Sequence, residues 1–246
     1  MTPGRGKHRL LLALCLLGLL LFGSLGVWQL ERRLWKLDLI ERVEARRHAD
    51  PVPPPPRAEW PRLDTAEIEY RRVSVTGHFL HERETLVDAL TERGAGSWVL
   101  TPLQTDQGTM LINRGFVPPE KRAAASRAAA LPQGEVSITG LLRLTEPDGR
   151  ILRPNEPAAE RWFSRDVAAI TRARGVADAA PFFIDADAAP NPGGYPVGGL
   201  TVVSFRNTHL VYALTWFGLA GLSAAGLVLL LRSAQGRRRW TGRSSP

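Results

Sequence analysis

A histidine and two large aromatic residues stand at the start of an apolar segment, where they could hold a flat metal cofactor. His209, Tyr212 and Trp216 follow one another at spacings of three and four, so a helix would place them on one face. Ala213 and Ala220 share that face and would leave room between the rings. Because a histidine nitrogen can bind haem iron axially while aromatic rings flank the macrocycle, this pattern favours a haem site.

Four residues at the end of an earlier apolar segment could complete such a site. Trp28, Gln29, Arg32 and Arg33 lie where that segment ends, and they would reach the depth of His209 if the two segments cross a membrane in opposite directions. Either arginine could neutralise a propionate of haem. The residues also allow a plainer interpretation, because aromatic residues are common at membrane interfaces and a histidine there can bond lipid headgroups or backbone.

Two apolar segments must position these residues, and each is long enough to cross a bilayer. Residues 10–30 and 209–231 are each about twenty residues long, which as a helix spans the ~30 Å hydrocarbon core. Residues 31–208 between them amount to one ordinary domain. We therefore expect an α+β membrane protein, in which an N-terminal and a C-terminal transmembrane helix flank one mostly β domain with a few helices.

The central domain is predicted to begin as helix and to continue as strands. Residues 31–50 contain neither glycine nor proline, so we expect a helical extension of the first span. Residues 51–57 form a proline-rich spacer, because proline ends a helix. Helices are predicted at 119–130 and 164–174. Strand-like segments are 68–80, 84–90, 97–104, 109–113, 135–144, 182–185 and 200–205. Their periodicity does not distinguish a barrel from a sandwich.

The net charge of +8 comes largely from basic residues beside the two apolar segments. Residues 1–9 and 232–246 are rich in lysine and arginine, so the positive-inside rule makes both ends cytoplasmic and the central domain extracytoplasmic. We expect membrane lipid, and not nucleic acid, as a partner. Nine residues are too few for a mitochondrial presequence. A bacterial inner membrane with a periplasmic domain is therefore expected.

Cysteine content argues against several kinds of site. The one cysteine, Cys15, lies in the middle of the first apolar segment, so a single chain offers no disulfide and no zinc or thiolate copper site. His78 and His81 are close in sequence but lack a third ligand nearby. A nucleophile elbow, a phosphate loop and a dinucleotide fingerprint are also missing from the sequence. We expect a protein that is not an enzyme.

Several segments, in the same order along nearly the whole chain, resemble the Surfeit locus protein 1 family of assembly factors for haem–copper cytochrome c oxidase. They are LGVWQLER from Leu25, YRRVSVTGHF from Tyr70, VLTPL from Val99, LINRGFVP from Leu111 and NTHLVYALTWF from Asn207. The resemblance implies two spans, an extracytoplasmic domain and a role in delivering or stabilising haem a for oxidase subunit I. The family's proposed haem-ligand histidine falls on His209, although Thr208 stands where a second Asn is usual.

We therefore predict a non-enzymatic assembly factor that receives haem a near the outer interface and presents it to subunit I. His209 would bind the iron, with Tyr212 and Trp216 packing the macrocycle and Arg32 or Arg33 neutralising a propionate. Oxidase subunit I and the haem a synthase are the expected protein partners. The alternative is a membrane scaffold that stabilises subunit I or the haem a synthase and never binds haem.

Overall fold

The computed structural model describes residues 5–201 and 207–241. The chain divides into two compact units. A helix unit comprises Met1–Arg42 with Ser204–Pro246, and a β domain comprises Val43–Val203. This arrangement confirms the predicted fold class, since two apolar helices near the ends of the chain flank a mostly β domain.

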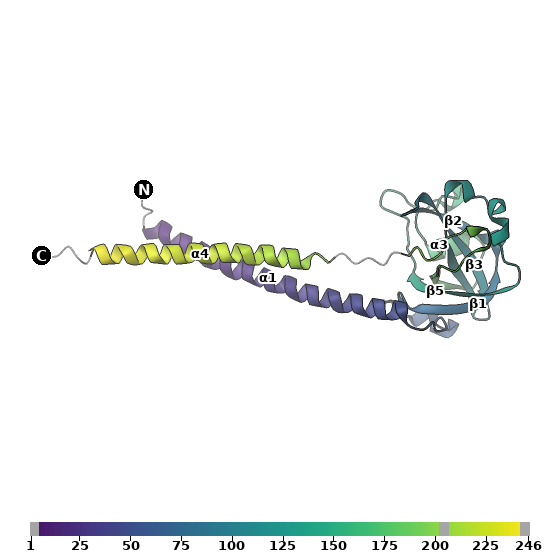
Figure 1. The fold of residues 1–246 in the computed structure, drawn as a ribbon, viewed down its shortest axis with the longest axis horizontal. Helices are drawn as coiled ribbons and strands as arrows, with labels where there is room; N and C mark the ends of the chain where they lie inside the picture. The colour runs from purple at the N-terminus through teal and green to yellow at the C-terminus, as the bar shows by residue number, and fades with distance from the viewer. Residues whose placement is uncertain (1–4, 202–206, 242–246) are drawn as a thin grey trace. The chain divides into compact units, whose positions relative to one another are not determined.

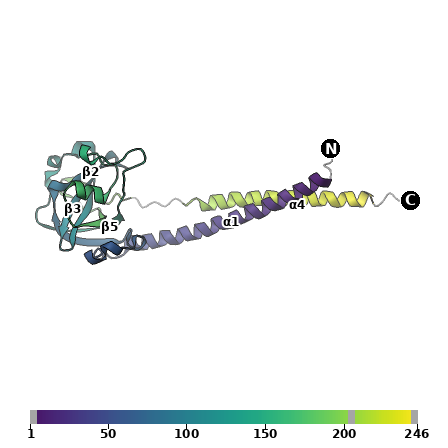
Figure 2. The same ribbon diagram turned by 180° about the vertical axis from the view of Figure 1, so that it is seen from behind.

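The helix unit contains α4 (His209–Thr241) and most of α1 (Arg5–His48), whose last residues, 43–48, belong to the β domain. Both are long and apolar enough to cross a membrane, and few of their apolar side chains are buried within the protein. In Figures 1 and 2, α4 lies along the N-terminal part of α1. Proline follows α1 at Pro51, where a missing backbone N–H prevents the helix from continuing.

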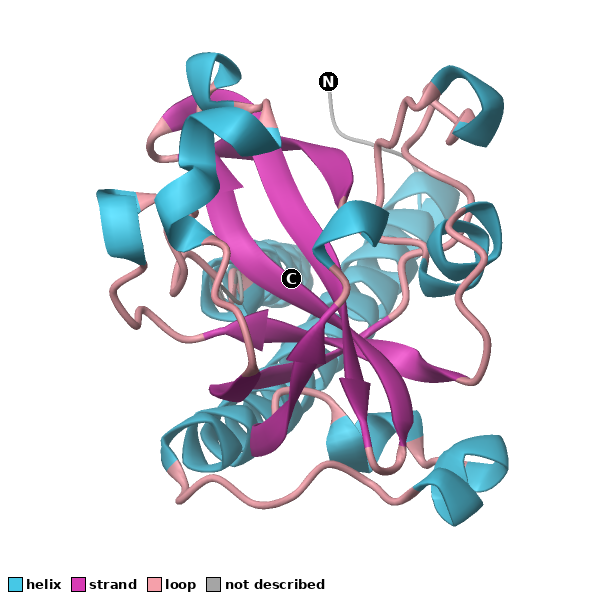
Figure 3. Cartoon of the chain, turned by 90° about the vertical axis from the view of Figure 1, so that its right-hand side faces the viewer, coloured by secondary structure: helices cyan, strands magenta, loops and turns pink. Residues whose placement is uncertain are grey.

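In the described part of the β domain, six strands form one sheet with the order β1-β5-β6-β4-β3-β2. Their bounds are β1 (Arg72–Phe79), β2 (Thr85–Thr91), β3 (Gly94–Thr105), β4 (Gly108–Val117), β5 (Glu135–Leu144) and β6 (Ala179–Ala186). β1 also pairs with β3, through His78 opposite Gln104 and Phe79 opposite Leu103. This extra pairing closes five strands into a small barrel, with β2 added outside β3; Figure 3 shows the curled strands.

One pair of strands in this barrel is parallel. β4 and β6 run in the same direction, while every other neighbouring pair is antiparallel. Nine of the ten residues of β4 are buried, as expected for a strand covered on both faces. β4 is therefore almost completely buried within the domain.

Two apolar clusters lie on the two faces of the sheet. One cluster gathers Val73, Leu103, Ile112 and Phe182 with their neighbours. The other gathers residues such as Trp162 and Ile170 beneath the short helix α3 (Val167–Ala173). The Asp166 carboxylate caps α3 by accepting the Ala169 N–H at 3.0 Å, which satisfies one of the free donors at a helix start.

The remaining helices are short. They are η1 (Arg57–Arg62), α2 (Thr65–Ile68), η2 (His81–Arg83), η3 (Pro119–Lys121), η4 (Ala124–Ala130), η5 (Pro157–Ala159) and η6 (Pro192–Gly194). The first predicted strand begins later than expected, at Arg72, because α2 occupies its first residue. Most of the strand predicted at 200–205 lies outside the described residues.

The helix predicted at 119–130 is replaced by η3 and η4, because the backbone between them is extended at Ala123, with a φ of −66° and a ψ of 128°. Arg127 has a non-helical φ of −128°. Its guanidinium donates to both carboxylate oxygens of Glu84, at 2.7 and 3.2 Å. It also donates to the carbonyls of Lys121 and Arg122. These charge-assisted hydrogen bonds hold η4 against Glu84, the residue before β2.

Candidate functional site

His209 occupies the first turn of α4 and bonds to a side chain of α1. Its Nδ1 lies 2.8 Å from Oε1 of Gln29, and both residues are half-buried. An amide oxygen only accepts, so Nδ1 carries the proton and donates. The neutral tautomer therefore keeps its lone pair on Nε2, which is the form that binds a metal.

The backbone before His209 fixes where α4 begins. The carbonyl of Thr208 accepts the Tyr212 N–H at 3.3 Å, so Thr208 precedes the first helical turn. Threonine is a favoured residue at this position. Because α4 starts at His209, the three-and-four spacing places His209, Ala213 and Trp216 on one face of the helix.

Small residues let the two helices approach closely beside this histidine. Ala213 is 1% exposed, and Gly26 of α1 is also buried. A Cβ added at Gly26 would meet the Phe217 ring at 2.6 Å. Further along, a Cβ at Gly18 would meet Ser223 Oγ at 2.8 Å. This is close packing of the kind that joins membrane helices, so the space beside Ala213 is filled by protein.

The predicted aromatic residues divide between the inside and the outside of the helix pair. Trp216 is half-buried and stacks on Phe22 of α1, with ring centroids 5.7 Å apart and an interplanar angle of 17°. Tyr212 and Trp28 are 54% and 50% exposed. Among the described residues, the structure thus joins His209 to Gln29 and Trp216 to Phe22, while Tyr212 and Trp28 face outward.

The two predicted arginines lie one turn further along α1. The Arg32 guanidinium stacks over the Trp35 ring, 4.7 Å from its centroid. Arg33 is half-buried and follows Gln29 by four residues, so it lies on the same face of α1 as Gln29. Both arginines therefore lie within about one turn of Gln29 along α1.

Comparison with known proteins identifies the family. Residues 16–221 match the SURF1 family model. Surfeit locus protein 1 of Mus musculus is 39% identical over 218 residues, which cover 82% of this chain and 69% of the relative. The Homo sapiens protein is also 39% identical, over 82% of this chain and 71% of its own length. The chain belongs to the Surfeit locus protein 1 family. A SURF1-like protein of Monosiga brevicollis is 36% identical over 87% of this chain and 85% of its own length.

The Surfeit locus protein 1 family consists of membrane proteins that act as assembly factors of cytochrome c oxidase. The family match includes both members of the Gln29–His209 pair and all six strands. The matched residues therefore include the site described above.

Sequence reasoning missed a buried polar network that this family member carries in its β domain. Asp185, only 2% exposed, accepts from Asn113 at 2.7 Å and from the guanidinium groups of Arg143 and Arg165 at 3.1 Å each. It also accepts from the Thr201 hydroxyl at 2.9 Å. An aspartate at the end of a buried apolar strand is the signal that could have indicated this network.

Arg165 extends the network to Glu146, and the two groups shift each other's pKa. Burial raises the pKa of Glu146, but the hydrogen bonds and charge of Arg165 outweigh it, so the net shift is downward. Burial likewise lowers the pKa of Arg165, and Asp185 and Glu146 reverse that into a net increase. Both groups are held in their charged forms. The network joins β4, β5 and β6 through hydrogen bonds to Asp185.

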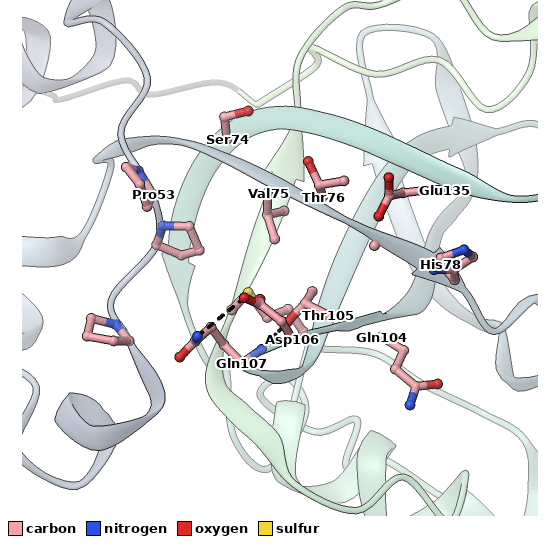
Figure 4. Close-up of a pocket in the computed structure, with 14 residues that line it drawn as sticks. Pro53, Ser74, Val75, Thr76, His78, Gln104, Thr105, Asp106, Gln107 and Glu135 are labelled. Carbon is pink, nitrogen blue, oxygen red and sulfur yellow. Dashed lines mark hydrogen bonds between the residues drawn. The ribbon is translucent and has the colours of Figure 1, made fainter.

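A groove of about 880 Å³ lies on the β domain, between the proline spacer and β1 (Figure 4). Prolines line one side and the 105–107 turn lines another. His78 stands at one end, near Glu135. His81 is engaged elsewhere, because its Nε2 lies 3.0 Å from the Pro132 carbonyl. In the described part of the chain, no three His, Cys, Asp or Glu residues are grouped to hold a metal ion.

Proposed function

We propose that this protein is a non-enzymatic assembly factor that receives haem a and presents it to nascent subunit I of cytochrome c oxidase. The observation that carries the proposal is the 2.8 Å hydrogen bond between Gln29 and His209. It joins two helices through the side chain best suited to bind haem iron.

His209 would supply the axial ligand, and Gln29 would position it. Histidines that bind metals usually donate their other ring N–H to a fixed acceptor, which sets the tautomer and the ring orientation. Gln29 Oε1 is such an acceptor for Nδ1. Gln29 is thus a positioning residue, and Nε2 of His209 is the atom that would meet the iron.

The surrounding residues suit a flat, acidic ligand that must later be released. Tyr212 and Trp28 are half exposed and could contact the macrocycle. Trp216 would form a fixed wall, because Phe22 already stacks against its ring. Arg32 and Arg33 would pair with propionates. A single protein ligand with an open surround favours transfer over permanent storage.

The proposed location is a bacterial inner membrane, with both chain ends in the cytoplasm and the β domain in the periplasm. The basic residues outside the two apolar segments support this orientation. The His209–Gln29 pair would then lie at the outer interface. There the haem a synthase would supply the haem, and subunit I would accept it.

One observation favours the scaffold alternative. A Cβ added at Gly218 or Gly221 of α4 would meet nothing within 4 Å, and Ala225 is also exposed. These small residues do not pack against α1. An open stripe of small residues can accept a helix of another membrane protein, such as subunit I or the haem a synthase.

Oxidase maturation in cells distinguishes the two functions. Cells lacking their own family member would receive the wild-type chain, His209→Ala, or the matched control His78→Ala, which removes an exposed histidine of the β domain. Delivery of haem a predicts that only His209→Ala lowers the haem a content and activity of the oxidase. Full maturation with His209→Ala, at equal protein level, would contradict delivery and favour the scaffold.

A further inference from the structure

A tight turn projects two aliphatic side chains from the β domain. Arg150 and Arg153 exchange two backbone hydrogen bonds of 2.9 Å, with Ile151 and Leu152 between them. Leu152 has a φ of +63°. Glycine or asparagine normally fills such a position, because a leucine Cβ crowds the backbone there.

The two aliphatic side chains of this turn are also almost fully exposed to solvent, which is unfavourable for apolar groups. Ile151 is 92% exposed and Leu152 is 95% exposed. Leu90 on β2 is also 77% exposed. It follows Asp88 by two residues, and the Asp88 carbonyl accepts a hydrogen bond from the Arg150 guanidinium at 3.4 Å. Among the described residues of the β domain, these three are the most exposed large apolar side chains.

Neither backbone preference nor burial explains Ile151 and Leu152 at this tip. Backbone strain persists where function requires it, and grouped exposed apolar side chains mark interaction sites. A contact outside the domain would account for both the exposure and the backbone strain of these two residues.

We propose that residues 150–153, here named the Ile151 tip, insert into the headgroup region of a lipid bilayer. The β domain is joined at both ends to helices that can cross a membrane, and such tethering raises the effective concentration of a bilayer around the domain. The tip is too small for a stable protein interface, which needs about 800 Å² from each partner. Two aliphatic side chains are enough for a secondary anchor.

The charges beside the tip fit anionic lipid. Arg150 and Arg153 border Ile151 and Leu152 in sequence, and both are exposed. Arg153 forms an ion pair with Asp88, in which Nη1 and Oδ2 are 3.9 Å apart. The Arg153 side chain is 65% exposed and the Asp88 side chain is 44% exposed. Such a wide and solvated ion pair contributes little. The arginine can therefore exchange Asp88 for a lipid phosphate at small cost.

Depth-dependent fluorescence quenching tests this proposal on the full chain. In a Cys15→Ala background, Ile151→Cys would carry an environment-sensitive fluorophore, and the protein would be placed in nanodiscs containing brominated anionic lipid. The matched control is the same label on Gln107→Cys, at the exposed β3–β4 turn. We expect the label at 151 to be quenched several-fold more than the label at 107.

A second label separates insertion from a local effect of the first. A fluorophore on Leu90→Cys should also be quenched, and Ile151→Ser with Leu152→Asn should abolish that quenching, since asparagine tolerates the positive φ. Equal quenching at 151 and 107 would overturn the proposal. Protection of the 151 label only when oxidase subunit I is added would also overturn it and would assign the tip to a protein partner. Neither result depends on haem binding.

Discussion

Gln29 and His209 lie 180 residues apart in sequence, and their side chains are joined by a 2.8 Å hydrogen bond between Oε1 and Nδ1. This bond joins α1 to α4 and also fixes the orientation and tautomer of the His209 imidazole. Whatever separates α1 from α4 also frees the histidine to rotate and to change tautomer.

Removing the acceptor should weaken haem a binding without removing the ligand. Gln29→Leu leaves Nδ1 of His209 without its partner, and we expect a roughly 10- to 100-fold loss of haem a affinity. Gln29→Glu keeps an acceptor at the same place and should retain affinity. Titration of the purified variants with haem a measures both. An unchanged affinity for Gln29→Leu would remove the positioning role.

The packing of α1 against α4 predicts a specific crosslink. A Cβ at Gly226 would lie 3.2 Å from Sγ of Cys15, so Gly226→Cys should form a disulfide with Cys15 on mild oxidation. Gly221→Cys is the matched control, because its Cβ would meet nothing within 4 Å. After the chain is cleaved between α1 and α4, a non-reducing gel shows whether the two fragments are still joined by the disulfide. A crosslink of equal yield at 221 would contradict this helix register.

Enlarging Gly26 should separate the helices. A Cβ there would meet the Phe217 ring at 2.6 Å, and this contact leaves no space for a valine. Gly26→Val should therefore lower the yield of the Cys15 crosslink to Gly226→Cys. Gly23→Val is a suitable comparison, since Gly23 has open space at its Cβ. Similar yields from the two valine variants would show that the Phe217 contact is not needed.

Neutralising Asp185 should destabilise the β domain strongly. Asp185→Asn leaves the buried guanidinium groups of Arg143 and Arg165 without their shared charge. Breaking a buried pair in this way costs about 3–5 kcal/mol. Asp187→Asn, which affects a more exposed pair with Arg72, should cost less than about 1 kcal/mol. Chemical denaturation measures the unfolding free energy of both variants. Equal losses of unfolding free energy would contradict a larger contribution from the buried network than from the exposed pair.

Glu146 should make stability depend on acid pH. Its pKa is lowered in the folded protein, because its bonds to Arg165 outweigh the effect of burial. A lowered pKa contributes stability that is complete above the ordinary value of 4.5 and is lost as pH falls through the folded value. Melting temperature should therefore fall more steeply below about pH 4.5 in wild type than in Glu146→Gln. If the melting temperatures of the two proteins fall in parallel with pH, Glu146 makes no such contribution to stability.

The sequence was most informative where one physical signal dominates. Apolar length predicted the two membrane helices, and alternation with β-branched residues located β5 at residues 135–144. The spacing from His209 to Trp216 also placed these two side chains on one face of a helix that begins at His209. Each of these features depends on neighbours in the chain.

Features that depend on distant contacts could not be predicted. The pairing of His78 with Gln104, which closes the barrel, has no local signal. Ala213 looked like space for a ligand, but only the position of α1 reveals that it is covered by protein. Arg127, in the predicted helix at 119–130, pairs with Glu84, 43 residues earlier. In each case a partner far away in sequence overrides the local pattern.

The central claim is that His209, held by Gln29, binds haem a. The most direct test is the absorption spectrum of detergent-purified protein made together with the haem a biosynthetic enzymes, compared with His209→Ala. The proposal predicts a haem a band in the wild-type protein that is lost in the folded variant and kept in His78→Ala. The same band in His209→Ala, or no band in any of the three while oxidase maturation continues, would contradict it.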